Sequence, residues 1–241
     1  MIALSDLCFS YSDNPDVLRY INLNVHRGDR LGIIGHNGCG KTTLFLLICG
    51  VLIPRSGEIR LLNQLVEPGT FYPEIGLVFQ NPDDQLFSAS VRDDVAFAPQ
   101  NIGLSEEEVE KRVTEALVVT GVQELAHRPP HHLSGGEKRM VAIAGVLAMH
   151  PQIIIYDEPT ANLDLRARRR LIQFLQKSQE TLMISSHDLE FVLEVCDRVI
   201  LMNNGEIVAD GFPYQLMNDA ELMETYGLER PHSLRPHHHP S

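Results

Sequence analysis

The sequence predicts an α/β fold in which a mainly parallel β-sheet is covered by helices on both faces. Two observations lead to it: short segments rich in Ile, Leu and Val recur along the chain, and helical patterns stand between many of them. The expected strands are 2–9, 17–25, 31–34, 58–62, 75–79, 153–156, 181–185 and 198–202. With 241 residues and 44% apolar content, the chain can form one large domain or two small ones around a buried core.

The clearest helix is expected directly after Ser105. Ser105 and Glu108 have the spacing of a capping box, and apolar positions repeat on one face of the residues that follow. That face comprises Val109, Val113, Ala116, Leu117 and Thr120. No strand is expected between Ser88 and His150, so this interval is interpreted as a helical insert. Further helices are expected at 165–177 and 188–196.

Composition and charge exclude several classes of protein. A net charge of −12 argues against a free-standing nucleic-acid binder and against a surface that clings to anionic lipid. The four cysteines have no metal-type spacing, which favours a reducing cytosolic compartment. The N-terminus does not resemble a signal peptide, and the longest apolar run, 44–53, is shorter than the ~20 residues that cross a bilayer. The chain is therefore expected to be soluble by itself.

A phosphate-binding loop is expected between the strand 31–34 and a helix. Residues 35–42 spell GHNGCGKT, which fits G-x-x-x-x-G-K-[ST] in the strand–loop–helix context that this motif requires. The glycines let backbone N–H groups converge on a phosphate, Lys41 reaches the β- and γ-phosphates, and the Thr42 hydroxyl suits Mg²⁺. The residues expected to bind ATP here are Gly35, His36, Asn37, Gly38, Cys39, Gly40, Lys41, Thr42 and Thr43.

Two adjacent acids end an apolar strand. Buried strands rarely end in neighbouring carboxylates unless a cation or a reaction offsets their desolvation and repulsion. Asp157 is the candidate to hold the shell of Mg²⁺ through water, and Glu158 is the candidate to polarise the attacking water. Three other residues are ambiguous by themselves. His187 is structural or meets a γ-phosphate, Gln80 only ends a strand, and Tyr11 packs or stacks on a base.

A second glycine turn, LSGG at 133–136, opens another helix. The chain contains three motifs, GHNGCGKTT, LSGGEKR and IIIYDEP, in this order. With them, the chain resembles the nucleotide-binding subunit of ABC transporters over nearly its whole length. The resemblance implies one ABC domain over 1–227, with an N-terminal antiparallel β part. Its P-loop NTPase (RecA-like) core would be 1–88 and 151–227, and its helical signature subdomain 89–150. The Pro- and His-rich residues 228–241 are expected to be disordered.

The resemblance also assigns roles to the ambiguous residues. It makes Tyr11 the adenine-stacking aromatic, Gln80 the residue that reaches Mg²⁺ and senses a membrane partner, and His187 the switch histidine. Mg²⁺ would then be held by Thr42, Gln80 and Asp157. Two subunits are expected to pack head to tail, so that the second glycine turn contacts the ATP held by the other copy. The residues expected to act on that second nucleotide are Leu133, Ser134, Gly135, Gly136, Glu137 and Asp164.

Further segments narrow the resemblance to a transporter group. QNPDDQLF (80–87) and VRDDVAFAPQNIGL (91–104) are similar to the ATPases of energy-coupling-factor importers, cobalt and nickel branch. This implies a second ATPase subunit, identical or paralogous, a transmembrane coupling subunit and a substrate-capturing membrane subunit, at the cytoplasmic face of the membrane. A vitamin or another micronutrient is the alternative solute. Asp93 and Asp94 either meet arginines of the membrane partner or form a solvated helix start.

Other function classes fit less well. A chromosome or repair ATPase needs long heptad arms, which 89–150 lacks, and a translation factor of this family needs two such domains. A regulatory module that holds ATP without cleaving it is disfavoured by Glu158 and His187. The His237–His239 run binds nickel or cobalt weakly or has no role.

Overall fold

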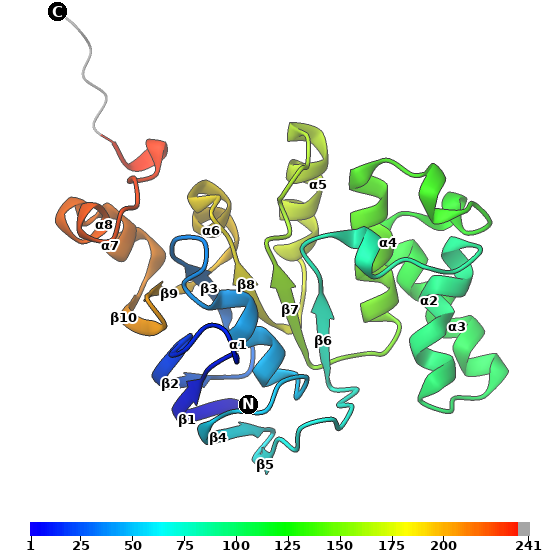
Figure 1. The fold of residues 1–241 in the computed structure, drawn as a ribbon. Coiled ribbons are helices and arrows are strands. Elements are labelled where there is room, and N and C mark those ends of the chain that lie inside the picture. The colour runs from blue at the N-terminus through cyan, green and yellow to red at the C-terminus, as the bar shows by residue number, and fades with distance from the viewer. Residues whose placement is uncertain (236–241) are drawn as a thin grey trace, which may run out of the picture. The chain divides into compact units, whose positions relative to one another are not determined.

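The computed structural model describes residues 1–235, which fall into two compact units. The first unit joins Met1–Thr70 to the chain from Met183 onward, and the second unit is Phe71–Leu182. Figure 1 shows the strands and helices of each unit.

An antiparallel sheet in the first unit has the strand order β2-β1-β4-β5. Its strands are β1 (Ile2–Phe9), β2 (Leu18–Val25), β4 (Ser56–Leu61) and β5 (Gln64–Leu65). In β1 the alternation of buried side chains is interrupted at Asp6, whose φ is 47°, and the pairing register with β2 shifts at this point. The bulge brings Leu7 and Phe9 to the same buried face as Ile2 and Leu4. The predicted antiparallel N-terminal part is confirmed.

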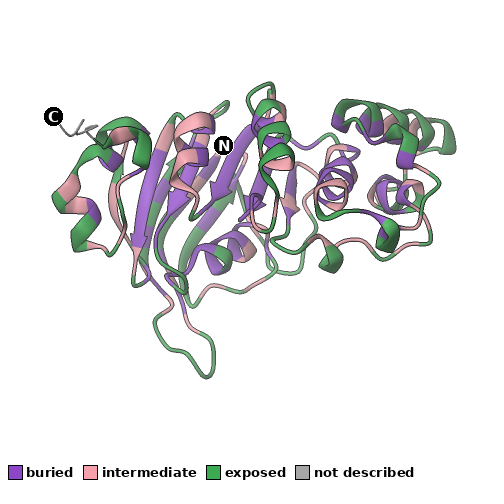
Figure 2. Ribbon diagram, turned by 90° about the horizontal axis from the view of Figure 1, so that it is seen from above, coloured by how far each residue is buried: buried purple, intermediate pink, exposed green. Residues whose placement is uncertain are grey.

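The remaining strands of the first unit follow the order β10-β9-β3-β8. They are β3 (Arg30–Ile34), β8 (Thr181–Ser185, in this unit from Met183), β9 (Arg198–Asn203) and β10 (Glu206–Gly211). β3 and β9 are parallel and read as unbroken apolar runs, as expected for strands buried on both faces. Figure 2 shows these strands in the colour of buried residues. β10 pairs antiparallel with β9 through a turn at Asn204–Gly205, where both φ angles are positive.

Four helices of the first unit are α1 (Lys41–Ile48), α6 (Leu189–Val195), α7 (Pro213–Asn218) and α8 (Ala220–Thr225). α6 packs closely on the sheet, because a Cβ added at Gly32 of β3 would lie 2.7 Å from Cγ1 of Val192. A short 3₁₀ helix, His232–Leu234, follows, and Ser233 donates from its N–H and O–H to the Glu190 carboxylate at 2.9 and 2.7 Å. The described part of the tail, residues 228–235, thus contains an ordered turn where disorder was expected. His237–His239 lie outside the described residues.

The second unit contains a parallel strand pair, β6 (Ile75–Val78) and β7 (Ile153–Asp157). Its helices are α2 (Val91–Asn101), α3 (Glu106–Thr120), α4 (Gly135–Leu147) and α5 (Leu165–Leu175), with 3₁₀ turns at Pro82–Asp84, Gln123–Leu125 and Pro130–His132. As predicted, the structure has no strand between Ser88 and His150, all of which are described. Within residues 1–235, no helix combines the length and the hydropathy needed to span a membrane.

The start of α3 confirms one half of the predicted cap. The Ser105 hydroxyl accepts the Glu108 N–H at 3.3 Å, but the Glu108 carboxylate instead takes the Arg112 Nε–H at 2.8 Å. The reciprocal bond of a capping box is therefore absent at this helix, because Arg112 lies one turn further along and competes for the acid. The predicted apolar face of α3 is buried throughout.

The acidic pair at the start of α2 corrects a further expectation. Asp94 is only 8% exposed, and its Oδ1 accepts the backbone N–H groups of Phe87 and Ser88 at 3.0 and 2.9 Å. It braces the chain that enters α2, so the solvated helix start does not hold for Asp94, and pairing with a membrane partner stays a prediction. Asp93 is exposed and accepts the Ser90 hydroxyl at 2.6 Å.

Candidate nucleotide-binding site

The loop between β3 and α1, which we call the P-loop (residues 35–42), can be formed only with glycine at two of its positions. Gly35 has φ 147°, and a Cβ there would lie 2.2 Å from the Met202 carbonyl oxygen. Gly40 has φ 107°, and a Cβ there would lie 2.6 Å from a Leu18 methyl group. Both glycines are thus required by their backbone conformation and by close packing.

Lys41 is the first residue of α1, and its side chain folds back over the loop. The ammonium group donates to the carbonyl oxygens of Gly35 and His36 at 2.9 and 3.3 Å. The residue is only 7% exposed, so its charge lies close to the loop backbone. Gly38, with φ 82°, has open space around the position of a Cβ. A buried ammonium group over a glycine loop at a helix N-terminus fits the phosphates of a nucleotide.

The other predicted P-loop neighbours divide into exposed and buried side chains. His36, Asn37 and Thr42 are exposed, whereas Cys39 is 1% exposed. The Cys39 sulfur would lie 2.9 Å from a Cβ at Gly35, so it fills space beneath the loop. The Cys39 side chain therefore packs beneath the loop.

Tyr11 lies beside the first turn of α1. Its hydroxyl is 3.2 Å from the Thr43 hydroxyl, and its ring meets Phe9 edge to face at a centroid distance of 4.8 Å. These contacts hold an aromatic ring, 38% exposed, next to the phosphate-binding helix. His187 follows β8, is exposed and precedes Asp188, which caps α6 by accepting the Phe191 N–H at 3.0 Å. The roles of Tyr11 and His187 stay predictions.

The two acids at the end of β7, Asp157 and Glu158, differ in backbone conformation. Asp157 continues the strand and is 4% exposed, whereas Glu158 is 6% exposed and has φ 46°. The left-handed conformation is costly for a non-glycine residue, and such strain persists where the surrounding structure enforces it. The chain turns sharply between the two carboxylates. This fits the separate roles predicted for Asp157 and Glu158.

The helix α4, which we call the signature helix, begins with a complete capping box. The Glu137 carboxylate accepts both the N–H and the O–H of Ser134, at 2.8 and 2.7 Å, and the Glu137 N–H donates back to the Ser134 hydroxyl. These bonds from Ser134 hold the pKa of the Glu137 carboxyl below its usual range. The complete capping box that was expected at Ser105 is thus found at Ser134. Its hydrogen bonds engage the Ser134 hydroxyl.

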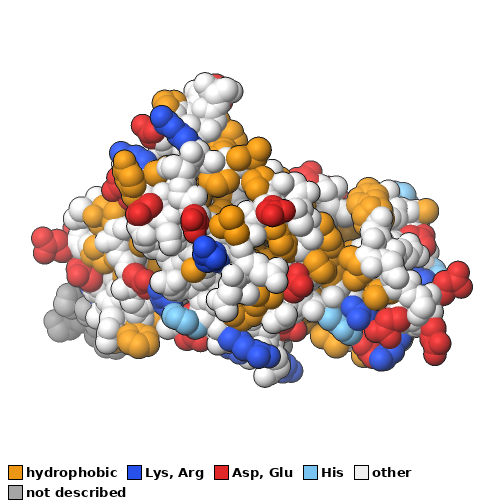
Figure 3. Space-filling view, turned by 90° about the horizontal axis from the view of Figure 1, so that it is seen from below, with side chains coloured by type: hydrophobic (Ala, Val, Ile, Leu, Met, Phe, Trp, Pro, Cys, Tyr) orange, Lys and Arg blue, Asp and Glu red, His pale blue; other side chains and the backbone are white. Residues whose placement is uncertain are grey.

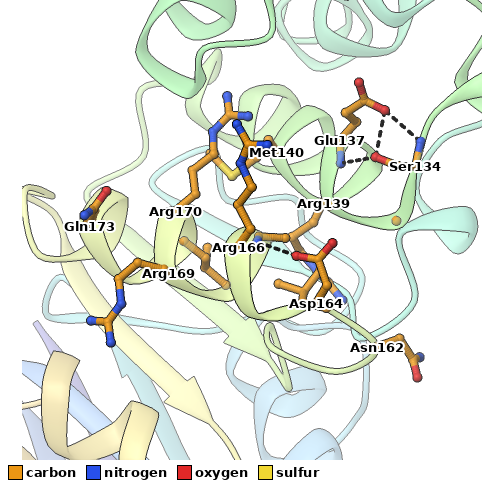
Figure 4. Close-up of a pocket in the computed structure, with 15 residues that line it drawn as sticks. Ser134, Glu137, Arg139, Met140, Asn162, Asp164, Arg166, Arg169, Arg170 and Gln173 are labelled. Atoms are coloured by element: carbon orange, nitrogen blue, oxygen red, sulfur yellow. Dashed lines mark hydrogen bonds between the residues drawn. The ribbon is translucent and has the colours of Figure 1, made fainter.

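A cavity of about 850 Å³ in the second unit brings together most residues predicted to act on the second nucleotide. Those that line it are Ser134, Gly135, Gly136, Glu137 and Asp164. Leu133, which precedes Ser134, is buried and is not among the lining residues. Figure 4 shows Ser134 and Glu137 joined at the start of α4 and Asp164 at the start of α5. Asp164 caps α5 by accepting the Ala167 N–H at 2.7 Å.

Three arginines of α5 give the cavity a positive character that the sequence analysis missed. Arg166, Arg169 and Arg170 line it, and Arg170 also donates to the carbonyl oxygens of Thr120 and Gly121 at 2.9 and 2.6 Å. The run LRARRR is a visible signal, but a basic run on a helix usually marks only a solvated face. Here it supplies cations beside a helix N-terminus, in a chain whose net charge is −12.

Comparisons with known proteins agree with these features. The family described as ABC transporter matches residues 18–161, which is more than half of the chain. The chain therefore belongs to the ABC transporter family. It has the ABC ATPase fold, as predicted, and is an ATP-binding, ATP-hydrolysing member of that family.

The relatives of this ABC ATPase include energy-coupling-factor proteins. It is 48% identical to the energy-coupling factor transporter ATP-binding protein EcfA of Methanothermobacter thermautotrophicus, over 96% of this chain and 77% of that protein. CbiO1 of Clostridium perfringens, part of the ABC transporter complex CbiONQ, superposes with a TM-score of 0.80 at 39% identity over 93% of each chain. A dimeric ATP-binding cassette bound to ADP and phosphate superposes with a TM-score of 0.78 at 27% identity, over 88% of this chain and 99% of that one.

Proposed function

We propose that this ABC ATPase powers an energy-coupling-factor importer through ATP-driven, head-to-tail closure of two subunits. The observation that carries the proposal is the exposed start of the signature helix, where Ser134 and Gly135 open into a cavity lined by arginines. This is a second anion site on a chain whose P-loop already provides one.

The P-loop would hold the triphosphate, with Lys41 moving its donors from loop carbonyls to phosphate oxygens. Thr42, Gln80 and Asp157 offer a hydroxyl, an amide and a carboxylate, which are oxygen donors of the kind that Mg²⁺ prefers. When bound, Mg²⁺ neutralises charge on the phosphates. Glu158 would polarise the attacking water, and His187 would contact the γ-phosphate.

The second half of the site would come from another copy or a paralogue. Ser134, the Gly135 and Gly136 amides and the dipole of α4 would approach the γ-phosphate, with Asp164 of the same cavity beside it. Hydrolysis would remove the charge that holds the halves together. The dimeric state of the relative bound to ADP and phosphate supports the association of two copies.

Membrane subunits would contact the second unit near Gln80. Phe87 and Phe97 are 65% and 47% exposed and stack edge to face at 4.9 Å, an apolar pair of the kind found at protein interfaces. Figure 3 shows exposed hydrophobic side chains among charged ones on the face seen from below. The ATPase would thus be peripheral to the cytoplasmic face of the membrane. Cobalt or nickel is the proposed solute, supported by the CbiO1 relative, with a vitamin as the alternative.

ATP-driven closure is tested with Glu158→Gln, measured by light scattering during gel filtration. The expected result is a dimer that accumulates with ATP while turnover falls about 100-fold or more. Adding Ser134→Arg should abolish the dimer while binding of a fluorescent ATP analogue is retained. A dimer that forms equally well with Arg at position 134 would reject the second half-site.

The solute is tested with the membrane subunits that co-purify with the chain, reconstituted in liposomes. Uptake of radioactive cobalt or nickel that requires ATP and is lost in Glu158→Gln supports the proposal. ATP-dependent uptake of a vitamin without metal uptake would replace it by the alternative.

A further inference from the structure

Arg139, in the second turn of the signature helix, is buried although it is charged. It is 1% exposed and heads the largest fully buried side chains in the described part of the chain. Burying a guanidinium group is expensive unless its donors are satisfied. Burial lowers the pKa of Arg139 to about 10, while the charge of Asp157 favours the protonated form, so the group stays cationic at neutral pH.

The guanidinium of Arg139 binds the peptide groups on both sides of Gln80. Its Nη1 donates to the Phe79 carbonyl oxygen at 2.5 Å, and its Nη2 donates to the Gln80 carbonyl oxygen at 2.6 Å. The first carbonyl belongs to the peptide before the Gln80 Cα and the second to the peptide after it. Holding both peptide planes fixes φ and ψ of Gln80 and therefore the direction in which its side chain leaves the backbone.

Two further contacts tie the same segment to the signature helix. Lys138 pairs with Asp83 at 2.6 Å, and the Gln85 side chain donates to the Ala142 carbonyl oxygen at 3.2 Å. Arg139 is the member of this set that acts on Gln80 itself. Both of its contacts are with backbone atoms about 60 residues away along the chain, so they are part of the tertiary structure.

We propose that Arg139 is a positioning residue that aims the Gln80 side chain by clamping its two flanking peptide groups to the signature helix. The proposal rests on the proposed function, in which Gln80 reaches Mg²⁺. It links the half-site for one copy's own nucleotide to the helix that contacts the other copy's nucleotide. Arginine is required because two carbonyls need a planar fork of donors, whereas a lysine ammonium has no such geometry.

The direct test is hydrogen exchange at the backbone amides of 79–81, compared between wild type, Arg139→Met and Arg139→Lys. Both variants should exchange faster in this segment while the core of β7 keeps its protection. The lysine variant keeps a positive charge and guards against a simple folding failure of the methionine variant. Unchanged exchange at 79–81 in a folded Arg139 variant would overturn the clamp.

The functional test is the gain in affinity for a fluorescent ATP analogue when Mg²⁺ replaces EDTA. Arg139→Met should reduce this gain about 5- to 10-fold, the size of couplings within one hydrogen-bond network, and leave binding in EDTA unchanged. The matched control is Arg112→Met. Arg112 also binds a backbone carbonyl, that of Met149 at 3.2 Å, but it lies on α3 away from Gln80 in the sequence. An equal loss in this control would reduce Arg139 to a structural role.

A double-mutant cycle with Gln80→Ala separates the two levels of the argument. If Arg139 acts through Gln80, Arg139→Met adds no further loss of the Mg²⁺-dependent gain on the Gln80→Ala background. Additive losses would overturn the proposal. If Gln80→Ala alone leaves the gain unchanged, the proposed contact of Gln80 with Mg²⁺ fails, and the clamp is still decided by hydrogen exchange.

Discussion

Two glycine turns of this ABC ATPase precede helices, and they are built in different ways. The P-loop carries its own cation, Lys41, directly over its backbone. The turn before the signature helix carries an acid, Glu137, which already occupies the N–H and O–H of Ser134. The cations that line the same cavity include Arg166 and Arg169 of α5.

The comparison separates two kinds of anion site. A loop with a resident ammonium group can bind phosphate in a single chain. A helix start occupied by its own carboxylate binds an anion only when that anion is brought to it and the arginines offset the acid. The proposed head-to-tail dimer would use one site of each kind. The P-loop binds first, and the signature turn responds to what a second copy presents.

The largest expected effect is at the cation of the P-loop. Lys41→Ala should weaken binding of a fluorescent ATP analogue about 100-fold, because charge-assisted bonds to phosphate are lost. Lys111→Ala on α3 is the control, since Lys111 is well exposed and pairs with Glu108 of the same helix. Retained nucleotide affinity in Lys41→Ala would remove the contrast between the two turns.

Paired glycine substitutions sharpen the comparison through stability. Gly35→Ala should lower the free energy of unfolding by about 2–3 kcal/mol or more, since the methyl group would lie 2.2 Å from a backbone oxygen in a left-handed conformation. Gly135→Ala should change stability by less than about 1 kcal/mol, because its Cβ meets nothing within 4 Å. Denaturant titration measures both. Equal losses would contradict the difference in packing.

The same contrast decides what could be predicted from sequence. The P-loop could be recognised from the sequence because its lysine and its glycines lie within eight consecutive residues between a strand and a helix. Three arginines of the signature cavity come from α5, a separate helix, and the Gln80 clamp joins residues 59 positions apart. No local pattern encodes such contacts. Most strands were found by their apolar runs, and the ABC fold by its motifs.

Local rules also failed in identifiable places. The capping box predicted at Ser105 is incomplete, because the Glu108 carboxylate binds Arg112, one turn further along the helix. Asp94 is buried where a solvated helix start was one expectation, because its carboxylate accepts the N–H groups of Phe87 and Ser88. The strand β10 and the helices α7 and α8 were missed because they are six residues long and lack a clear period.

The arginines of the signature cavity are expected to matter for association and not for nucleotide binding by one copy. The double variant Arg166→Gln, Arg169→Gln should weaken the ATP-driven dimer of Glu158→Gln about tenfold at low salt and less at high salt, because exposed charges are screened. Arg55→Gln with Arg60→Gln in the first unit is the control. A salt-independent loss would point to damaged packing of α5.

The smallest expected effect is at the acid of the signature turn, where removing a charge should strengthen association. Glu137→Gln should tighten the ATP-driven dimer about threefold, the size expected for one charge at a helix N-terminus. Glu108→Gln, at the same position after Ser105 in α3, is the control.

The same acid predicts how the effect depends on pH. Because the pKa of Glu137 is lowered, its carboxylate stabilises the helix start above the ordinary glutamate pKa of about 4.3. That stabilisation is lost only as pH falls through the lowered value, so the threefold difference should be the same at pH 6 and pH 8. Weaker association of Glu137→Gln would show that the acid aids the approach of the second nucleotide and would invert the comparison of the two turns.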